Sequence, residues 1–447
     1  MRQTTQIIEF LQRPFIRDAV TLQAGSVVST GLSFVASLVY ARVLGAELFG
    51  TYSLVIAFAG IVAVFFDLGA TYSASTLLSE AVAKEDPAEI KSILGYYLKL
   101  SALVSFAVGA IAILLAPFIS RVAYGRSDVG EFARWVILGQ AVLFLFVFLT
   151  LVLLAARRMR LLTILENTQR FLEKALPIIL VLLGFGILGI VFGILAAALI
   201  MAIVGLLLYV RFTRTNPFFP PLKELFGKLR TFSMKKYFWF GVQIAVDKNL
   251  GDLMSMIPVL LLGAFAARAT VGHYRIAFAY MTLPLILLTP IGRLLVVHLP
   301  QVKARTGLAQ ARAQFWRASL ASGALAALLV IPFVVLGPFL VRLFYGEEFL
   351  PAIPLTYWLI PYPVILGFGV GLGAMFRTLN QVKAAIWING LSLLLGLPLA
   401  YWLIRTYGAK GVIFTLLFWA AVTIGASHLW LKRVFRLYER GNSGAGV

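Results

Sequence analysis

Charged side chains recur at helical spacing inside an apolar stretch of this 447-residue chain. In TILENTQRFLEKALPIIL, beginning at Thr163, the residues Glu166, Arg170 and Lys174 are each four apart, and Glu173 precedes Lys174. Residues four apart share one helix face, so the spacing predicts a charged strip. Charge is costly within a membrane, which favours a polar cavity where basic groups bind an anion and carboxylates bind a cation or a proton. An internally neutralised strip that fixes helix packing is the alternative.

A second apolar stretch, FGVQIAVDKNLGDLMSMIPVL, has its charges near the middle. Asp247, Lys248, Asn249 and Asp252 cluster there, and Lys248 and Asp252 are four residues apart. A carboxylate beside a lysine at this depth is typical of a proton or sodium relay. An ion pair buried between helices is the competing interpretation.

Three isolated residues complete the candidate set. Asp67, in FFDLGATYS, is either an ion site or a residue that caps a turn or fixes helix packing. Arg275 and Arg293 bracket another apolar segment, where Arg293 either contacts phosphates or extends to lipid headgroups. We expect substrate binding by Arg170, Lys174, Lys248, Arg275, Arg293 and Asn249. We expect ion coupling by Glu166, Glu173, Asp247, Asp252 and Asp67.

Motifs of several enzyme classes are missing from the sequence. There is no cysteine, and His273, His298 and His428 are scattered near the ends of apolar segments. The nucleotide-binding pattern GxxxxGK[ST] and the hydrolase patterns GxSxG and HExxH do not occur. We therefore expect no enzymatic activity, no metal centre, no cofactor and no nucleic-acid partner.

Composition identifies the elements that must hold these residues. The chain is 61% hydrophobic and 13% charged, and runs of about 20 apolar residues, enough to span a bilayer as a helix, recur along it. We predict an all-α polytopic membrane protein with about twelve transmembrane helices. The expected spans are 19–41, 51–76, 93–119, 131–156, 163–185, 188–210, 237–262, 271–297, 314–341, 353–376, 383–404 and 410–431.

Basic residues set the expected orientation. An even number of spans leaves both termini on one side, and the segments on that side carry most of the Lys and Arg outside the membrane. They include Arg157, Arg158 and Arg160, and seven basic residues in 211–236. The positive-inside rule therefore predicts that both termini are cytoplasmic. The net charge of +21 is chiefly this signal, and attraction of an anionic substrate is its second interpretation.

The two halves of the sequence repeat one another. PFISRVAYG at Pro117 matches PFLVRLFYG at Pro338, and GILGIVF at Gly186 matches GAKGVIF at Gly408, at offsets of 221 and 222 residues. Six-span repeats have the same orientation, which predicts two pseudo-symmetric lobes around a cavity, as in transporters. The expected domains are an N-terminal lobe (1–210), a cytoplasmic linker with an amphipathic helix (211–236) and a C-terminal lobe with a cytoplasmic tail (237–447).

One segment carries a specific family resemblance. Residues 41–75, ARVLGAELFGTYSLVIAFAGIVAVFFDLGATYSAS, resemble a pattern of arginine, Leu-Gly, Phe-Gly-x-Tyr and Asp-Leu-Gly. This is the signature of bacterial polysaccharide biosynthesis membrane proteins, the O-antigen flippases of the Wzx type. LLLGAFAARATVGHYRIAF, VVHLPQVKAR and PFLVRLFYGEEFLPAIPLTYWL resemble its second-repeat counterparts, so the likeness covers nearly the whole chain. The family belongs to the multidrug/oligosaccharidyl-lipid/polysaccharide (MOP) superfamily, which also contains MATE-type multidrug exporters.

The resemblance implies a function. Such proteins carry undecaprenyl-pyrophosphate-linked oligosaccharides across the bacterial inner membrane, from the cytoplasmic to the outer leaflet, with proton or sodium antiport as the expected drive. Besides this substrate and the bilayer, the implied partners are the polymerase and chain-length proteins of the pathway. A desolvated pyrophosphate needs Arg or Lys, as the candidate set supplies. The motif residues Gly45, Gly50, Asp67 and Gly69 look more like fold determinants.

Three other functions stay open at this stage. A MATE-like, cation-coupled exporter of small molecules would need a net acidic cavity for its cationic ligand. A membrane-embedded glycosyltransferase or phosphotransferase would show bond cleavage by the pure protein. A scaffold of an assembly complex would move no lipid.

Overall fold

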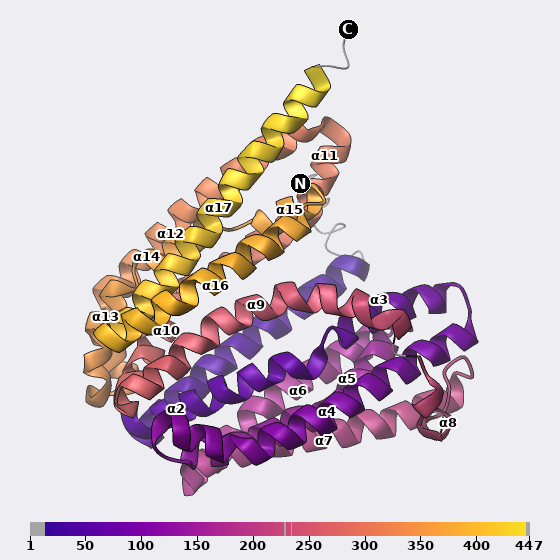
Figure 1. Cartoon of the computed structure of the whole chain (residues 1–447), viewed down its shortest axis with the longest axis horizontal. Helices are drawn as coiled ribbons and strands as arrows, with labels where there is room; N and C mark the ends of the chain where they lie inside the picture. Colours follow the sequence, from indigo (N-terminus) through magenta and orange to yellow (C-terminus); the bar gives the residue numbers. More distant parts are fainter. Residues whose placement is uncertain (1–13, 228, 234, 444–447) are drawn as a thin grey trace, which may run out of the picture. The chain divides into compact units, whose positions relative to one another are not determined.

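The structure is a computed structural model, and all regular elements of its described residues are helices (Figure 1). The backbone is described for residues 14–227, 229–233 and 235–443. Side chains are described for the same residues except 14–30, 230, 235–236, 239–248 and 439–443. The helices form two compact units: unit 1 comprises Met1–Gly45 and Phe58–Val246, and unit 2 comprises Ala46–Ala57 and Asp247–Val447.

Unit 1 is a bundle built around α5, which packs along α4 and along α7. Its core is aromatic: the Phe148 ring lies 6.1 Å from that of Tyr97 and 4.7 Å from that of Tyr209, measured between ring centroids. Burial of such rings supplies most of the packing energy of a bundle. The elements are α2 (Pro14–Asp67, shared with unit 2), α3 (Ala70–Ala83), α4 (Pro87–Tyr124), α5 (Asp128–Ala155), α6 (Met159–Leu180), the π-helical turn η1 (Val181–Phe185), α7 (Gly186–Thr215), α8 (Leu222–Gly227), the 3₁₀ turn η2 (Leu229–Thr231) and the start of α9 (Lys235–Phe265).

The segment after α7 folds back onto unit 1. Its helix α8 falls where the sequence predicts an amphipathic helix, with Leu225 fully buried and Phe226 exposed. The Tyr209 hydroxyl donates a hydrogen bond to the Pro220 carbonyl at 2.6 Å, and Lys91 on α4 pairs with Glu224. This side of the predicted amphipathic helix is therefore held by protein contacts.

Unit 2 repeats the bundle with more broken helices. Here α12 packs against α11 and α14, and α16 packs against α17. The elements are the rest of α9, α10 (Arg268–Ile286), α11 (Thr289–Thr306), α12 (Leu308–Tyr345), the 3₁₀ helix η3 (Glu347–Ala352), α13 (Ile353–Trp358), α14 (Pro361–Phe368), α15 (Leu372–Thr378), α16 (Val382–Tyr407) and α17 (Ala409–Ser443).

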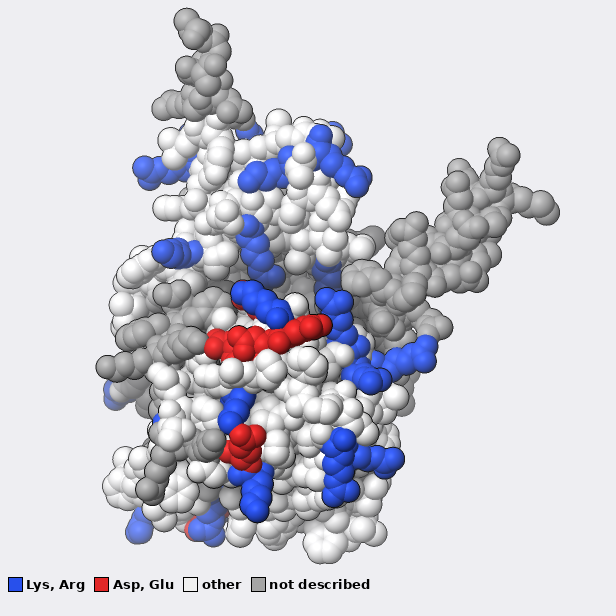
Figure 2. Space-filling view, turned by 90° about the vertical axis from the view of Figure 1, so that its right-hand side faces the viewer, with Lys and Arg blue, Asp and Glu red and all other residues white. Residues whose placement is uncertain are grey.

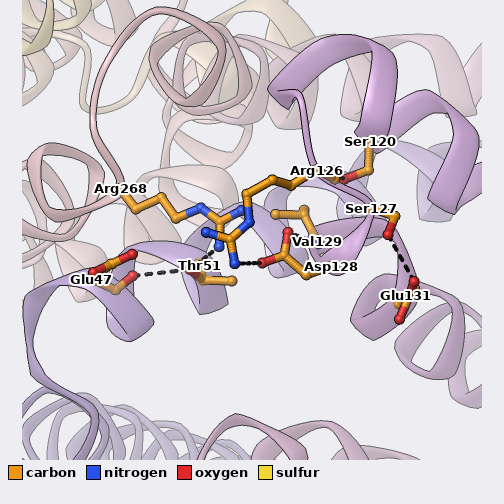
Figure 3. Close-up of polar contacts among 9 residues, drawn as sticks. All are labelled: Glu47, Thr51, Ser120, Arg126, Ser127, Asp128, Val129, Glu131 and Arg268. Atoms are coloured by element: carbon orange, nitrogen blue, oxygen red, sulfur yellow. Dashed lines mark hydrogen bonds and ion pairs between the residues drawn. The ribbon is translucent and has the colours of Figure 1, made fainter.

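Two glycines of the repeat let α2 and α10 touch backbone to backbone within unit 2. A Cβ atom on Gly50 would lie 1.9 Å from the Arg268 carbonyl oxygen, and one on Gly272 would lie 2.3 Å from the Ala46 carbonyl oxygen. No residue with a side chain fits at either position without movement of the backbone. The Arg268 guanidinium, which donates to the Thr51 hydroxyl at 3.2 Å, also ties the two helices together (Figure 3).

The same frame is built twice in the backbone. Helices α4 and α12 both have 38 residues and begin 221 positions apart. In each half, the glycine at the turn before the last helix has nearly the same dihedral angles: φ 54° and ψ −136° at Gly186, φ 56° and ψ −127° at Gly408. The repeat inferred from the sequence is therefore confirmed.

Every predicted span coincides with helix, but three of the spans are interrupted. The second span breaks after Asp67, where Leu68 and Gly69 have positive φ angles of 40° and 78°. The eighth bends by 45° between α10 and α11, and the tenth bends by 46° before Pro361. Prolines break helices because they lack an N–H group and clash with the preceding turn, and Pro284 and Pro361 lie at these bends.

The described helices are long and apolar enough for a multi-pass membrane protein. Seven could cross a bilayer, or nine if each bent pair is one span. Two of the seven, Gly31–Ala83 and Met159–Thr215, are 53 and 57 residues long. The first contains the second predicted span and the end of the first, and the other contains the fifth and sixth predicted spans. The chain reverses within them at Gly45 (φ 70°, ψ 176°) and near Gly184 (φ 91°, ψ 6°), conformations that favour glycine.

Candidate functional site

Helix α6 of unit 1 has one packed face and one polar face. Leu162, Thr163, Leu165 and Pro177 are its buried residues. Glu166, Glu173 and Lys174 are half-buried, and Arg170 is exposed. The charged strip predicted from the spacing is therefore present, and it lies outside the core of unit 1.

The pairing along the α6 strip differs from a simple ladder of ion pairs. Gln169 donates from Nε2 to Glu173 Oε2 at 3.1 Å, and Lys174 Nζ lies 3.7 Å from Glu173 Oε1. Among the described residues, Glu166 and Arg170 form no ion pair, although their spacing would allow one. Arg170 is thus an arginine without a carboxylate partner in the described part of the chain.

Helix α9 carries the second predicted cluster, of which only part is described. Asp247 and Lys248 are in the helix, but their side chains lie outside the described residues, as does the predicted contact between Lys248 and Asp252. Asn249 and Asp252 are half-buried. One turn further on, the Ser255 hydroxyl donates to the Asp252 carbonyl oxygen at 2.8 Å.

Beside this turn, unit 2 contains a pocket of about 250 Å³. It is lined by α9, α14, α16 and α17, and its polar groups come from Ser255, Tyr362, Asn389 and Thr423. The Thr423 hydroxyl oxygen is buried and has no hydrogen-bond partner among the described residues. Sequence reasoning did not select Tyr362 or Thr423, because single polar residues in apolar helices carry no spacing signal.

Asp67 lies at the break between α2 and α3. Its Oδ1 accepts a hydrogen bond from the Thr71 backbone amide at 3.0 Å, so it satisfies a free N–H group at the start of α3. Gly69 takes the left-handed conformation that the turn requires. The Asp-Leu-Gly part of the motif is therefore the sequence of a helix break, and an ion-coupling role for Asp67 stays a prediction.

The two remaining arginines lie on either side of the α10–α11 bend. Arg275 is half-buried on α10, next to the fully buried Tyr274, and Arg293 is exposed on α11. The described structure does not bring them into one cluster with the α9 residues. The candidates thus form a strip on α6 in unit 1, a polar turn of α9 beside a pocket in unit 2, and three separate positions.

Solved structures of low sequence identity share this fold. A multidrug resistance MATE family transporter of the MOP superfamily, in its inward-facing conformation, aligns with a TM-score of 0.70 at 16% identity, over 92% of this chain and 96% of that one. A MOP superfamily transporter from Pyrococcus furiosus aligns with a TM-score of 0.65 at 15% identity, over 93% and 94%. A MATE structure in complex with MaD3S gives 0.61 at 18%, over 95% and 96%.

These likenesses show that the chain has the all-helical fold of these MOP superfamily structures, as the sequence predicted. No curated protein matches the sequence. The family described as "Polysaccharide biosynthesis protein" matches residues 15–297, which is more than half of the chain. This match shows that the chain belongs to the polysaccharide biosynthesis protein family. The motif in residues 41–75 forms the crossing of α2 with α10 at Gly50 and the helix break after Asp67.

Proposed function

We propose that this protein is a flippase for a polyprenyl-pyrophosphate-linked oligosaccharide. It moves the substrate from the cytoplasmic to the outer leaflet by alternating access, with the sugar in the protein and the lipid tail in the membrane. The observation that carries the proposal is the family match on a transporter fold. The α6 strip of this chain also contains Arg170, which has no carboxylate partner among the described residues. The Wzx type, an O-antigen or related repeat unit, and both termini in the cytoplasm belong to this proposal.

The α6 strip suits a pyrophosphate group. A charged residue at the centre of a membrane helix costs roughly 2.5–3.5 kcal/mol on insertion scales, so an arginine kept there needs compensation by a ligand or by water. Arg170 has no carboxylate partner among the described residues, and Lys174 is only weakly held at 3.7 Å from Glu173. Both can therefore exchange water for phosphate oxygens, to which guanidinium and ammonium groups form strong charge-assisted hydrogen bonds.

The half-buried carboxylates supply the coupling ion sites. Glu173 in unit 1 and Asp252 in unit 2 are each able to bind a proton or Na⁺. A cation that binds one alternating-access state more tightly shifts the equilibrium towards it, while the anionic substrate favours the other. Antiport follows if the two ligands prefer opposite states.

A small-molecule exporter of MATE type is the second candidate. The unit 2 pocket of about 250 Å³, with Tyr362 and Trp419 in its lining, suits a compact organic ligand better than an oligosaccharide. Asp252 lies on the same helical turn as the pocket residues Gly251 and Ser255, and would supply the negative charge that an organic cation needs.

Transport in proteoliposomes tests the proposal. The lipid is undecaprenyl pyrophosphate with a short labelled glycan, a pH or sodium gradient is imposed, and an external glycan-modifying enzyme reports arrival in the outer leaflet. We expect gradient-dependent flipping that falls at least about tenfold in Arg170→Ala, since one charge-assisted contact to phosphate is lost. Arg121→Ala, another exposed arginine, is the matched control and should retain the wild-type rate. Efflux of a cationic dye without lipid movement would favour the exporter instead.

A further inference from the structure

Three helices in the described part of the chain end in the same turn. In each, one backbone amide donates to the carbonyl three residues before it, and the next amide donates to the carbonyl five residues before it. The residue in the left-handed conformation is Glu85 after α3, Arg157 after α5 and Asn380 after α15, with φ angles of 54°, 56° and 57°. Glycine, and less often asparagine, occupies this position in helix ends of this kind.

Glu85 and Arg157 are therefore held in a strained backbone conformation. A left-handed φ angle is unfavourable for a residue with a long side chain, and residues strained in this way are concentrated at functional sites. Asn380 forms the same turn in unit 2 with a residue that tolerates the conformation. The turn itself does not account for a glutamate and an arginine at the two positions in unit 1.

The side chains of Glu85 and Arg157 line one hollow of unit 1. Its volume is about 730 Å³, and its lining comes from α3, the end of α5 and the start of α6. Both residues are exposed, and neither side chain has a hydrogen bond or an ion pair in the described part of the chain. The two opposite charges thus share a hollow without forming an ion pair, so each can contact a ligand. None of the candidate residues for transport lines this hollow.

The α3 wall of the hollow presents hydrogen-bond acceptors. The hydroxyls of Ser75 and Thr76 donate to the Tyr72 carbonyl oxygen at 2.9 and 3.1 Å. The Ser79 hydroxyl donates to the Ser75 carbonyl oxygen at 2.7 Å. Because a hydroxyl has only one proton, these oxygens can only accept further hydrogen bonds. Together with the Glu85 carboxylate, they suit a cation with several N–H groups, such as a primary ammonium.

The wall formed by α5 and α6 presents donors and apolar surface. Arg157 lies there, and its guanidinium group has five N–H donors and no acceptor. A guanidinium binds phosphate through paired, charge-assisted hydrogen bonds. Met159 in the lining is exposed, as is Tyr72, which lies one helical turn before Thr76 on α3. The hollow therefore combines groups for a phosphate, groups for an ammonium and exposed apolar side chains.

The hollow lies where lipid headgroups are expected. Thr76 is the last residue of the second predicted span, and Ala156 is the last residue of the fourth. The segments that follow these two spans are both predicted to be cytoplasmic. A ligand with a phosphate, an ammonium and a hydrocarbon part would reach this level from the cytoplasmic leaflet, since the hydrocarbon core ends where the spans end.

Positive charge alone would not select a position on this side of the molecule. On the face shown in Figure 2, which includes the α3–α4 turn, basic side chains are spread widely and acidic side chains gather in a few places. A purely anionic headgroup is attracted to many positions on such a face. A headgroup that carries both charges matches only a position where a carboxylate and an arginine line the same hollow.

We propose that the hollow lined by Glu85 and Arg157 binds the headgroup of a zwitterionic phospholipid with a primary amine, phosphatidylethanolamine. The phosphate lies against the Arg157 guanidinium, and the ammonium lies between the Glu85 carboxylate and the hydroxyl oxygens of α3. The acyl chains leave over Tyr72 and Met159. The site does not rest on the proposed flippase activity, because the bound lipid links α3 to the α5–α6 turn whichever substrate the protein carries.

Binding to the purified full-length chain in detergent tests the proposal. Three probes are titrated separately: a short-chain phosphatidylethanolamine, the matching phosphatidylcholine and soluble phosphoethanolamine. A thermal-shift titration gives the affinity for each probe, and native mass spectrometry counts the bound lipid. Phosphatidylcholine has the same charges but no N–H group, so it should bind at least about tenfold more weakly. Phosphoethanolamine lacks the acyl chains and should also bind at least about tenfold more weakly, because its apolar contacts are missing.

Two variants introduce the residue that unit 2 has in this turn. Arg157→Asn removes the partner of the phosphate, and Glu85→Asn removes the partner of the ammonium. Each should lower the affinity for phosphatidylethanolamine at least about tenfold, because a charge-assisted contact is lost. Asparagine tolerates the left-handed conformation, so both variants should keep or raise the Tm of the lipid-free protein. Loss of binding at an undiminished Tm separates the loss of a ligand contact from misfolding.

Arg158→Asn is the matched control. Arg158 is exposed and adjacent to Arg157, but it does not line the hollow, so its variant should bind phosphatidylethanolamine within about twofold of wild type. The proposal fails if Arg157→Asn or Glu85→Asn binds the lipid as tightly as wild type, or if the control loses as much affinity as they do. It also fails if phosphatidylcholine or soluble phosphoethanolamine binds as tightly as phosphatidylethanolamine.

Discussion

Alanine at Gly50 should damage the crossing of α2 and α10 in unit 2. Its Cβ would lie 1.9 Å from the Arg268 carbonyl oxygen and 2.7 Å from the carbonyl carbon. Both of these are backbone atoms, which cannot rotate away as the end of a side chain can. The helices must therefore separate, which weakens the packing on each side of the crossing.

The size of the effect follows from the distances. Contacts of a Cβ atom below 3.0 Å essentially never occur, so the carbonyl oxygen must retreat by about 1.1 Å. An extra methyl group in a well-packed interior destabilises a protein by about 1–3 kcal/mol. The Gly50 substitution should be near the upper end of this range, because the added Cβ meets backbone atoms that cannot rotate away. For a unit of this size, about 3 kcal/mol lowers the Tm by roughly 6–12 °C.

Thermal unfolding in detergent measures the loss of stability. The control is a glycine-to-alanine substitution that is expected to raise the Tm. Gly425 is a helical glycine of unit 2 with no atom within 4 Å of its Cβ position. Gly425→Ala should therefore stabilise the protein by about 0.4–1 kcal/mol, because alanine restricts the unfolded chain. Gly272→Ala acts at the same crossing, so its effect should not add fully to that of Gly50→Ala. A Gly50→Ala variant as stable as Gly425→Ala would refute the reasoning.

Three further substitutions separate structural from transport roles. Asp67→Ala removes the acceptor for the Thr71 amide and should lower the free energy of unfolding by about 1 kcal/mol, whereas Asp67→Asn should keep most of that stability. Loss of transport in a stable Asp67→Asn variant would instead indicate ion coupling. Leu225→Ala opens a cavity under α8 and should cost about 2–5 kcal/mol, with faster proteolysis of residues 216–236 as the readout. Glu173→Gln removes a titratable group, so we expect the stimulation of flipping by a pH gradient to fall about tenfold, while the affinity for the phosphate-containing substrate stays within about twofold of wild type. Unchanged stimulation would exclude Glu173 as the coupling residue.

Properties that depend on residues close together in the chain were predictable from the sequence. Runs of apolar residues place the helices, because the length of a span is set by the thickness of the bilayer. The offset of 221 to 222 residues predicts the repeated frame, and it reappears in the dihedral angles of Gly186 and Gly408. The charged face of α6 follows from the helical period alone.

Properties that depend on which distant residues meet were decided only by the tertiary structure. The family motif contains Gly50, but its purpose is visible only where that glycine meets the α10 backbone. The sequence allows Glu166 and Arg170 to pair, yet Glu173 takes the contacts with Gln169 and Lys174. The pocket of about 250 Å³ in unit 2 has no local signal either, because residues of α9, α14, α16 and α17 line it together. The length of an apolar run and the period of a helix can be read from neighbouring residues in the sequence. Cavities and contacts depend on how distant segments pack together, which neighbouring residues do not determine.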